Sequence, residues 1–113
     1  MAYENAAKDA MLDELGTLIL YAGLLDDGDS EVTGGDPAYA RKAVTFAASS
    51  GGSMAANGTL PTFDIPASTT VNKVILMSAE TDGTKYAEVD VTDEVFAGQG
   101  TYELTAITLD LNA

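Results

Sequence analysis

The apolar positions near the start of the chain recur at the spacing of an α-helix. Four of them are separated by four, four and three residues: Ala7, Met11, Leu15 and Leu18. Asn5 is a residue type that caps helix starts, and Gly16 is a type that commonly follows helix ends. The pattern therefore predicts one amphipathic helix over about residues 4–15.

The next part of the chain alternates between apolar runs and turn residues, which favours strands. Residues 17–25 form an apolar run before the polar cluster at 26–31, and this predicts a buried strand. In residues 38–46 apolar and polar side chains alternate, so a second strand is predicted there. The alternation places Lys42 on one face of that strand and Arg41 on the other.

The rest of the chain predicts one loop and four more strands. Residues 49–58 are rich in glycine and serine, which predicts a flexible loop. The further strands are expected at residues 60–65, 69–79, 85–91 and 101–111. Asp82-Gly83 predicts a tight hairpin turn, and apolar residues on both faces of 69–79 predict a central strand. The alternation changes near Ala106, which predicts a bulge or burial on both faces.

Together these elements predict the fold class. Several short strands after a single helix are typical of a mainly β protein, here a β-sandwich or a barrel-like fold with one N-terminal α-helix. The 113 residues have the usual length of one domain, and no internal repeat divides them. We therefore expect a single domain over residues 1–113, with the helix followed by the β-sandwich.

The charge balance narrows the range of partners. The chain has 18 acidic and five basic residues, and its formal net charge is -13. A field of this sign repels nucleic acids and anionic lipid surfaces, so we expect no nucleic acid and no membrane among the partners. The start of the chain lacks the pattern of a signal peptide, and the apolar run Leu18–Leu25 is too short to cross a bilayer.

The residue types that common catalytic sites need are scarce. The chain contains no cysteine and no histidine, which removes thiolate chemistry, the commonest general base and the commonest transition-metal ligand. Ser49, Ser50 and Ser53 therefore lack the histidine that activates a serine nucleophile. The acidic residues do not isolate one pair of carboxyls of the glycosidase type. We expect no enzyme activity and no cofactor.

The acidic run from Asp26 to Glu31 is a candidate metal site. Carboxylate and carbonyl oxygens converging from a flexible loop are the ligands that calcium prefers. However, Gly28 is the third residue of the run, whereas the EF-hand loop has its glycine at the sixth position. A solvated turn is therefore the favoured interpretation.

Arg41 and Lys42 form the second candidate site. Both could bind an anion together with the backbone N–H groups of Gly34 and Gly35, because glycine turns can form anion nests. Their opposite directions along a strand weaken this hypothesis. The favoured alternative is that each pairs with a nearby acid, either within the fold or on a neighbouring subunit.

Four segments of the chain also carry a resemblance to a known family. AAKDAMLDELG, EVTGGDPAYARKAVTF, GTLPTFDIPASTTVNKVILMSA and FAGQGTYELTAITLDL resemble small virion proteins of tailed bacteriophages, a family often labelled tail fibre proteins. The resemblance covers nearly the whole chain, and its most telling stretches are GGDPAYARKAV and GQGTY. It implies a structural component of the virion without a cofactor, present in many copies on the particle surface and made in the bacterial cytoplasm.

Two locations on the particle are compatible with the resemblance. A fibre shaft normally shows long repeats or heptads, which the sequence lacks, so a capsid decoration or minor capsid protein that binds the major capsid protein is favoured. A tail or tail-fibre subunit is the alternative. The third hypothesis is a carbohydrate-binding module that uses Tyr39, Tyr86 and Tyr102 as stacking platforms, provided that these rings are exposed.

The decoration hypothesis predicts an assembly surface. It includes the strand from Tyr39 to Phe46, the acidic turn before it and the glycine-rich loop after it. The candidate interface residues are Gly34, Gly35, Tyr39, Arg41, Lys42 and Met54. They would contact the major capsid protein, other virion subunits or further copies of this chain, as a homo-oligomer in the particle.

Overall fold

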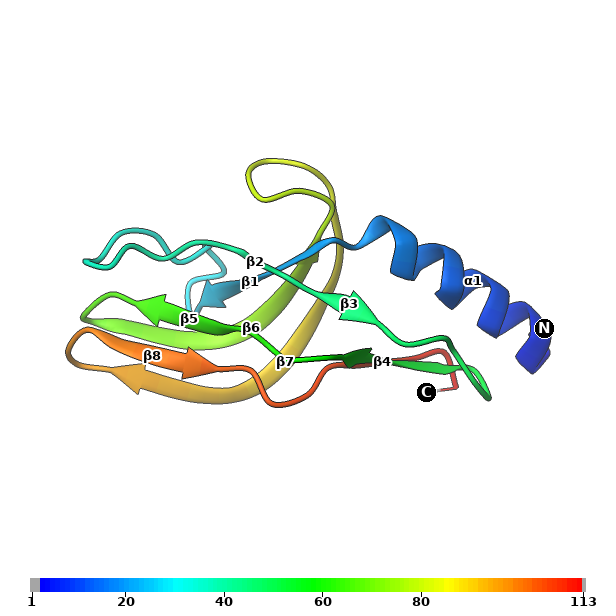
Figure 1. Ribbon diagram of the computed structural model, residues 1–113. Helices are drawn as coiled ribbons and strands as arrows, with labels where there is room; N and C mark the ends of the chain where they lie inside the picture. The colour runs from blue at the N-terminus through cyan, green and yellow to red at the C-terminus, as the bar shows by residue number, and fades with distance from the viewer. Residues whose placement is uncertain (1–2, 113) are drawn as a thin grey trace.

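The computed structural model describes residues 3–112 of the chain. Within these residues it contains one helix, α1 (Asn5–Leu18), and nine strands. The strands are β1 (Tyr21–Asp26), β2 (Lys42–Ala43), β3 (Thr45–Phe46), β4 (Ser53–Asn57), β5 (Thr62–Ile65), β6 (Thr69–Met77), β7 (Lys85–Phe96), β8 (Gly100–Glu103) and β9 (Thr108–Asp110). The molecule measures 46 × 23 × 22 Å, and α1 lies at one end of it, beside β4 (Figure 1). The mainly β fold class with one N-terminal helix is confirmed.

The helix α1 is longer than its apolar pattern predicts. It continues past Gly16 to Leu18, so the strand predicted from residue 17 starts only at Tyr21. Gly16 lies where the helix contacts β4, and a Cβ atom at this position would lie 3.2 Å from the Sδ atom of Met54. The glycine therefore allows close packing of helix and strand, and it does not end the helix.

The first sheet has four antiparallel strands in the order β2-β1-β6-β7. The two central strands, β1 and β6, bury side chains on both faces. Their inner face joins the main core through Ala22, Leu24, Val71, Val74 and Leu76. Their outer face carries a smaller cluster of Leu25, Ile75 and Met77. This confirms the predicted buried strand after the helix and the predicted central strand within residues 69–79.

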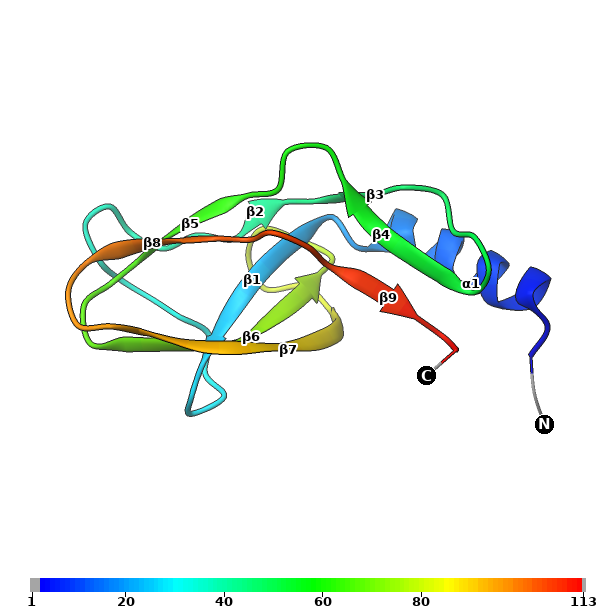
Figure 2. The same cartoon turned by 90° about the horizontal axis from the view of Figure 1, so that it is seen from below.

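The second layer is a long antiparallel ribbon. The segment with β4 and β5 pairs with the segment that carries β8 and β9, giving the pairs β4-β9 and β5-β8. β2 and β3 are separated only by Val44, and they pair with β1 and β4 respectively. One short segment thus joins the two layers along one side of the molecule (Figure 2).

On the other side the two layers are not joined by strand pairing. β7 and β8 are connected by the turn at residues 97–99, but no pair between β7 and either β8 or β9 forms within residues 3–112. The pairs therefore run from β7 through β6, β1, β2 and β3 to the ribbon, as in an incomplete barrel. A gap between β7 and β8 remains.

The main core fills the space between the two layers. Its largest fully buried side chains come from both layers and from the end of the helix: Ile19, Leu24, Phe63, Ile65, Val71, Val74 and Leu76. Burial of one such side chain stabilises a protein by about 1.5–3 kcal/mol. Because both layers supply these residues, neither layer can bury its apolar face without the other.

Two predicted elements differ from the structure in the middle of the chain. The strand predicted for residues 38–46 is reduced to β2 and β3, because residues 38–41 leave the sheet and turn Tyr39 and Arg41 toward Glu31. The flexible loop predicted for residues 49–58 is also wrong. Half of it, residues 53–57, forms β4, which obtains its hydrogen bonds from β3 and β9.

The last predicted strand is divided in two. Residues 104–107 link β8 to β9, and both Leu104 and Ile107 are buried there. The change of alternation near Ala106 therefore marks the link between two strands. Leu104 and Ile107 belong to the two alternating sets of residues, and both are buried, as one of the two predictions for this segment requires.

Candidate functional site

Arg41 joins separate parts of the chain by hydrogen bonds. Its Nε and Nη2 atoms donate to the two carboxylate oxygens of Glu31 at 2.9 and 2.8 Å, which is a bidentate ion pair. Its Nη1 atom donates to the carbonyl oxygens of Ala79 and Asp82 at 3.0 and 2.7 Å. These carbonyls belong to the loop between β6 and β7. Only 10% of the Arg41 side chain is exposed, so its contacts are internal.

Tyr39 completes the same cluster. Its hydroxyl donates to Oε2 of Glu31 at 2.8 Å and accepts the backbone N–H of Leu24 at 2.8 Å. Its ring stacks on the buried ring of Phe63, with the ring centroids 6.2 Å apart. We call Glu31, Tyr39 and Arg41 the Arg41 network. Tyr39 connects this network to the core, so its ring is not available as a stacking platform for a sugar.

The contacts of the Arg41 network determine its charges. Partial burial alone raises the pKa of Glu31, but hydrogen bonds from Arg41 and Tyr39 and the charge of Arg41 bring it below the usual value. Burial, together with the adjacent carboxylate, raises the pKa of Tyr39. The hydrogen bond to Glu31 raises the pKa of Arg41. At neutral pH the network therefore holds one carboxylate, one guanidinium and a neutral phenol.

The stabilising effect of Glu31 should disappear on acidification. Its pKa is lower in the folded than in the unfolded chain, so its contribution is complete above the unfolded value of about 4.3 and is lost as the pH falls through the folded value. Urea unfolding of the wild type and Glu31→Gln at several pH values measures this contribution. We expect the difference in free energy of unfolding to be largest near neutral pH and to shrink below about pH 4. A difference that is constant down to about pH 3 would contradict the prediction.

The anion site that was considered for Arg41 is not formed. The Glu31 carboxylate occupies the guanidinium, and an anion placed there would meet this negative charge. Gly34 and Gly35 do have positive φ angles of 87° and 97°, but the Gly34 carbonyl serves the turn by accepting the N–H of Tyr39 at 2.9 Å. The favoured interpretation is that Arg41 and Lys42 each pair with an acid, within the fold or on a neighbouring subunit, and Arg41 forms the first kind of pair, with Glu31.

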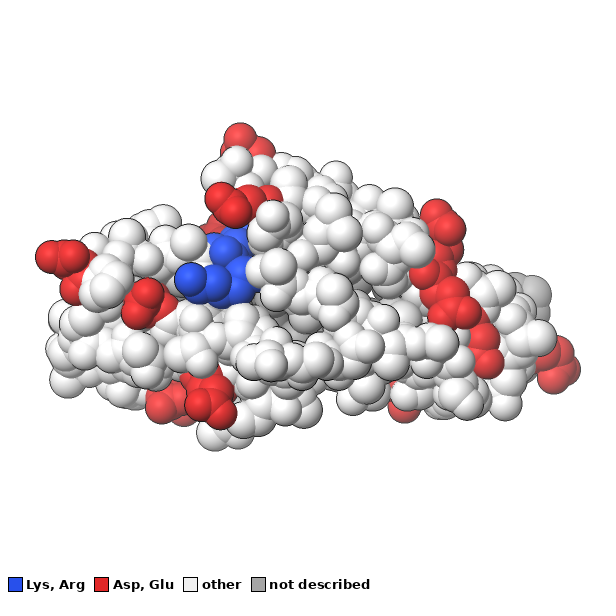
Figure 3. Space-filling view, in the orientation of Figure 1, with Lys and Arg blue, Asp and Glu red and all other residues white. Residues whose placement is uncertain are grey.

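The remaining residues of the predicted interface are placed differently from one another. Lys42 is half-buried in β2 and forms no ion pair within residues 3–112. Met54 is 2% exposed and packs beneath Gly16 of α1, which corrects the prediction that it contacts a neighbouring subunit. Figure 3 shows one small group of basic side chains on the face that carries β2, with acidic side chains near it. Gly34 and Gly35 are exposed, so the predicted surface is internal only in part, at Met54 and in the contacts of Tyr39 and Arg41.

The acidic turn uses its carboxylates within the fold. Oδ1 of Asp26 accepts the N–H groups of Gly28 and Ser30 at 2.9 and 3.0 Å, and Asp29 pairs with Lys73 at 2.7 Å. Within the described part of the chain, no group of three or more acidic residues is placed to hold a metal ion. The carboxylates of Asp26 and Asp29 are therefore used in contacts within the fold, which agrees with the favoured interpretation of a solvated turn.

The helix α1 leaves part of its apolar surface uncovered. Leu12 is buried against the strands, whereas Met11 and Leu18 lie seven residues apart on one side of the helix and are 42% and 40% exposed. We call Met11 and Leu18 the α1 stripe. Leu20, just beyond the helix, is also exposed. The apolar spacing in the sequence identified Met11 and Leu18, but it placed them on the buried face of the helix. They are exposed because the apolar sector of α1 is wider than the strands can cover.

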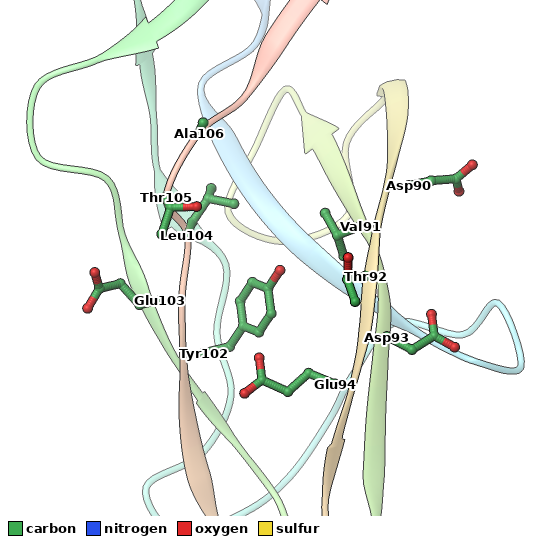
Figure 4. A pocket seen from close by; sticks show the side chains of 10 residues that line it. All are labelled: Asp90, Val91, Thr92, Asp93, Glu94, Tyr102, Glu103, Leu104, Thr105 and Ala106. Atoms are coloured by element: carbon green, nitrogen blue, oxygen red, sulfur yellow. The ribbon is translucent and has the colours of Figure 1, made fainter.

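A groove of about 580 Å³ occupies the gap between β7 and β8. Its lining consists of Asp90, Val91, Thr92, Asp93, Glu94, Tyr102, Glu103, Leu104, Thr105 and Ala106. We call it the β7–β8 groove. In Figure 4, Glu94 of β7 reaches toward Tyr102 of β8, while Asp90, Asp93 and Glu103 point away from the space between the strands. Burial and the negative charge of Glu94 raise the pKa of Tyr102.

Sequence patterns did not reveal the β7–β8 groove. Its two walls are consecutive strands that the turn at residues 97–99 connects, but they do not pair with each other within residues 3–112, and no local signal marks an edge that stays unpaired. The chain matches no protein-family model, no curated protein and no solved structure. Within residues 3–112, no helix has the length and the apolar character needed to cross a membrane.

Proposed function

We propose that the chain is a structural component of a tailed-phage virion, most simply a small capsid decoration protein that binds the shell and stabilises it. The observation that supports this proposal best is the α1 stripe, which places two exposed apolar side chains on a helix at one end of an elongated body (Figure 1). Apolar side chains that stay exposed along one side of a surface helix can dock into an apolar groove of a partner protein.

A decoration protein does not need a large interface for each copy. Two half-exposed side chains contribute only a few kcal/mol when a partner covers them, but the symmetry of a shell repeats the contact many times. The charge of -13 makes copies of the chain repel one another, so they do not aggregate at high local density. The resemblance to small virion proteins agrees with this role.

The carbohydrate-binding alternative has less support. Its three tyrosines should present exposed rings, but Tyr39 is held inside the Arg41 network and against Phe63. Tyr102 is half-buried and packs against the main core. A tail or tail-fibre subunit stays the closest alternative, because the same exposed helix could bind a tail protein.

Loss of the α1 stripe should release the protein from particles. We expect Met11→Gln combined with Leu18→Gln to weaken binding to particles at least tenfold, because about 1 kcal/mol is lost for each apolar side chain that a partner covers. Particles made without the protein are incubated with purified variants, and the bound copies are counted against protein concentration. Val95→Gln combined with Leu111→Gln is the matched control, since both residues are exposed and lie outside the helix.

The same measurement separates the hypotheses. Equal loss in the control variant, or unchanged binding of the α1 variant, would remove the stripe from the interface. A reconstruction of the decorated particles locates the bound copies: density on the shell supports the decoration role, and density confined to the tail supports the alternative. Absence of the wild-type protein from purified particles would contradict both.

A further inference from the structure

The backbone hydrogen bonds of β1 determine, strand by strand, which backbone groups of β7 point toward the β7–β8 groove. Leu24 donates its N–H to the Tyr39 hydroxyl and accepts the N–H of Val32 at its carbonyl, at 2.8 and 3.1 Å. Both partners lie on the side of β1 that is opposite to β6, so Leu24 forms a non-hydrogen-bonded pair with its β6 neighbour, Val74. The backbone groups of Val74 therefore point away from β1 and toward β7.

The backbone directions then follow on β7. Val74 is paired with Val89, so the N–H and carbonyl of Val89 point toward β6. Because successive residues alternate, the N–H and carbonyl groups of Glu88 and Asp90 point away from β6, toward the open edge of β7. Asp90 lines the β7–β8 groove, so its backbone donor and acceptor face the groove.

The opposite wall presents the same kind of edge. Leu104, just after β8, donates its N–H to the carbonyl of Pro61 at 3.0 Å, on the side of β5. By alternation the backbone groups of Glu103 point to the other side, into the groove that this residue also lines. Five lining residues stand on each wall, so an extended segment of about five residues, roughly 16 Å long, would span the groove. β7 is irregular between Asp90 and Glu94, where its register with β6 shifts, so Asp90 and Glu103 are the residues whose backbone groups define the two edges.

The side chains around the groove define what such a segment should look like. Val91, Tyr102 and Leu104 pack against or within the main core and supply apolar surface inside the groove, and the carboxylate of Glu94 reaches into the same space (Figure 4). Asp90, Asp93 and Glu103 are exposed and point outward on both walls (Figure 4), and the lining contains no basic residue. A strand that enters the groove would thus turn alternate side chains toward apolar surface and toward carboxylates.

We propose that the β7–β8 groove binds an extended segment of a partner protein in which apolar and basic residues alternate, by addition of a strand between β7 and β8. That the segment belongs to a neighbouring virion subunit rests on the proposed function. A second copy of this chain is disfavoured as the occupant, because acidic residues on both walls repel a chain of charge -13.

A synthetic probe tests the groove without particles. The probe is a capped peptide of about eight residues that alternates valine and lysine, a length that covers the groove with a margin at each end. The control peptide has the same composition with the valines and the lysines in two blocks. Isothermal titration calorimetry at physiological salt should give at least tenfold tighter binding for the alternating peptide. Equal affinities would mean that charge alone drives binding, which overturns the proposal.

Two variants at one position separate strand addition from charge. Asp90→Ala and Asp90→Pro remove the same carboxylate, but only proline removes the N–H that faces the groove. We expect Asp90→Pro to bind the alternating peptide at least tenfold more weakly than Asp90→Ala, which corresponds to about one lost backbone hydrogen bond. Equal binding by the two variants would overturn the proposal. Circular dichroism and thermal unfolding check that both variants are folded.

A measurement on the unmodified chain is independent of how the proline variant folds. Hydrogen exchange followed by NMR should show at least tenfold slower exchange at the amides of Asp90 and Glu103 when the alternating peptide is bound. Unchanged exchange at both amides would contradict strand addition. Sedimentation shows whether the chain self-associates, and a dimer that Asp90→Pro disrupts would assign the groove to a second copy and overturn the proposal. Because these tests use purified protein, their failure does not affect the particle experiment, which tests the proposed function separately.

Discussion

Replacing Arg41 with glutamine should lower the free energy of unfolding by about 3 kcal/mol, at the lower end of the range for breaking a buried ion pair. The variant leaves the Glu31 carboxylate without its bidentate partner, and it leaves the carbonyls of Ala79 and Asp82 without their donor. The Arg41 and Glu31 side chains are only 10% and 28% exposed, so water compensates these losses incompletely. Urea unfolding at neutral pH measures the change.

The adjacent residue provides the control for Arg41. Lys42→Gln removes the same charge one position along the chain, from a side chain without an ion pair among residues 3–112. Its effect on the free energy of unfolding should not exceed about 0.5 kcal/mol. Similar losses at both positions would show that the net charge, and not the hydrogen-bond geometry, sets the stability. In the particle assay, Lys42→Gln also tests a part of the predicted assembly surface that is not internal.

Replacing Gly23 with alanine should lower the free energy of unfolding by about 2 kcal/mol, within the range for overpacking a core. A Cβ atom at Gly23 would lie 2.8 Å from the Tyr39 hydroxyl oxygen, 3.0 Å from Oε2 of Glu31 and 3.1 Å from Cγ1 of Ile75. The first two are the atoms that share a hydrogen bond in the Arg41 network. Gly23 is in a regular strand, so the expected loss comes from space and not from backbone conformation.

Gly98 is the matched control for Gly23. A Cβ atom there would meet nothing within 4 Å, and its φ angle is not in the left-handed region. Thermal unfolding of Gly98→Ala should be close to that of the wild type. Combining Gly23→Ala with Tyr39→Phe tests the mechanism further, because the two substitutions should lose less together than the sum of their separate effects. Additive losses would mean that the added methyl group does not act through the tyrosine hydroxyl.

Several features of the fold could be predicted because they depend on neighbours in the sequence. The side chains of Ala87, Val89 and Val91 pack against the main core, as the alternation in residues 85–91 predicts. The buried strand after the helix and the central strand at 69–79 follow from apolar residues on both faces. The expectation that Arg41 pairs with an acid is confirmed, and the structure shows that this acid belongs to the same chain.

Other features depend on segments that are far apart in the sequence, and local patterns do not contain them. Ser53–Asn57 has the composition of a loop, but it becomes β4 because β3 and β9 supply its hydrogen bonds. Gly16 has the character of a helix end, yet it lies inside the helix, where it allows Met54 of β4 to pack closely. The same packing buries Met54 and leaves the α1 stripe exposed.

By itself the sequence determined the mainly β fold class, the single N-terminal helix, the strongly acidic surface and the lack of imidazole and thiol groups. Only the tertiary structure decided that Arg41 binds Glu31 and the loop of β6 and β7, that Met54 is buried, and that β7 and β8 face each other unpaired across a groove. The physical reason is the range of the interactions. Alternation and capping act over two to four residues, whereas strand pairing and side-chain burial are settled when the whole chain packs.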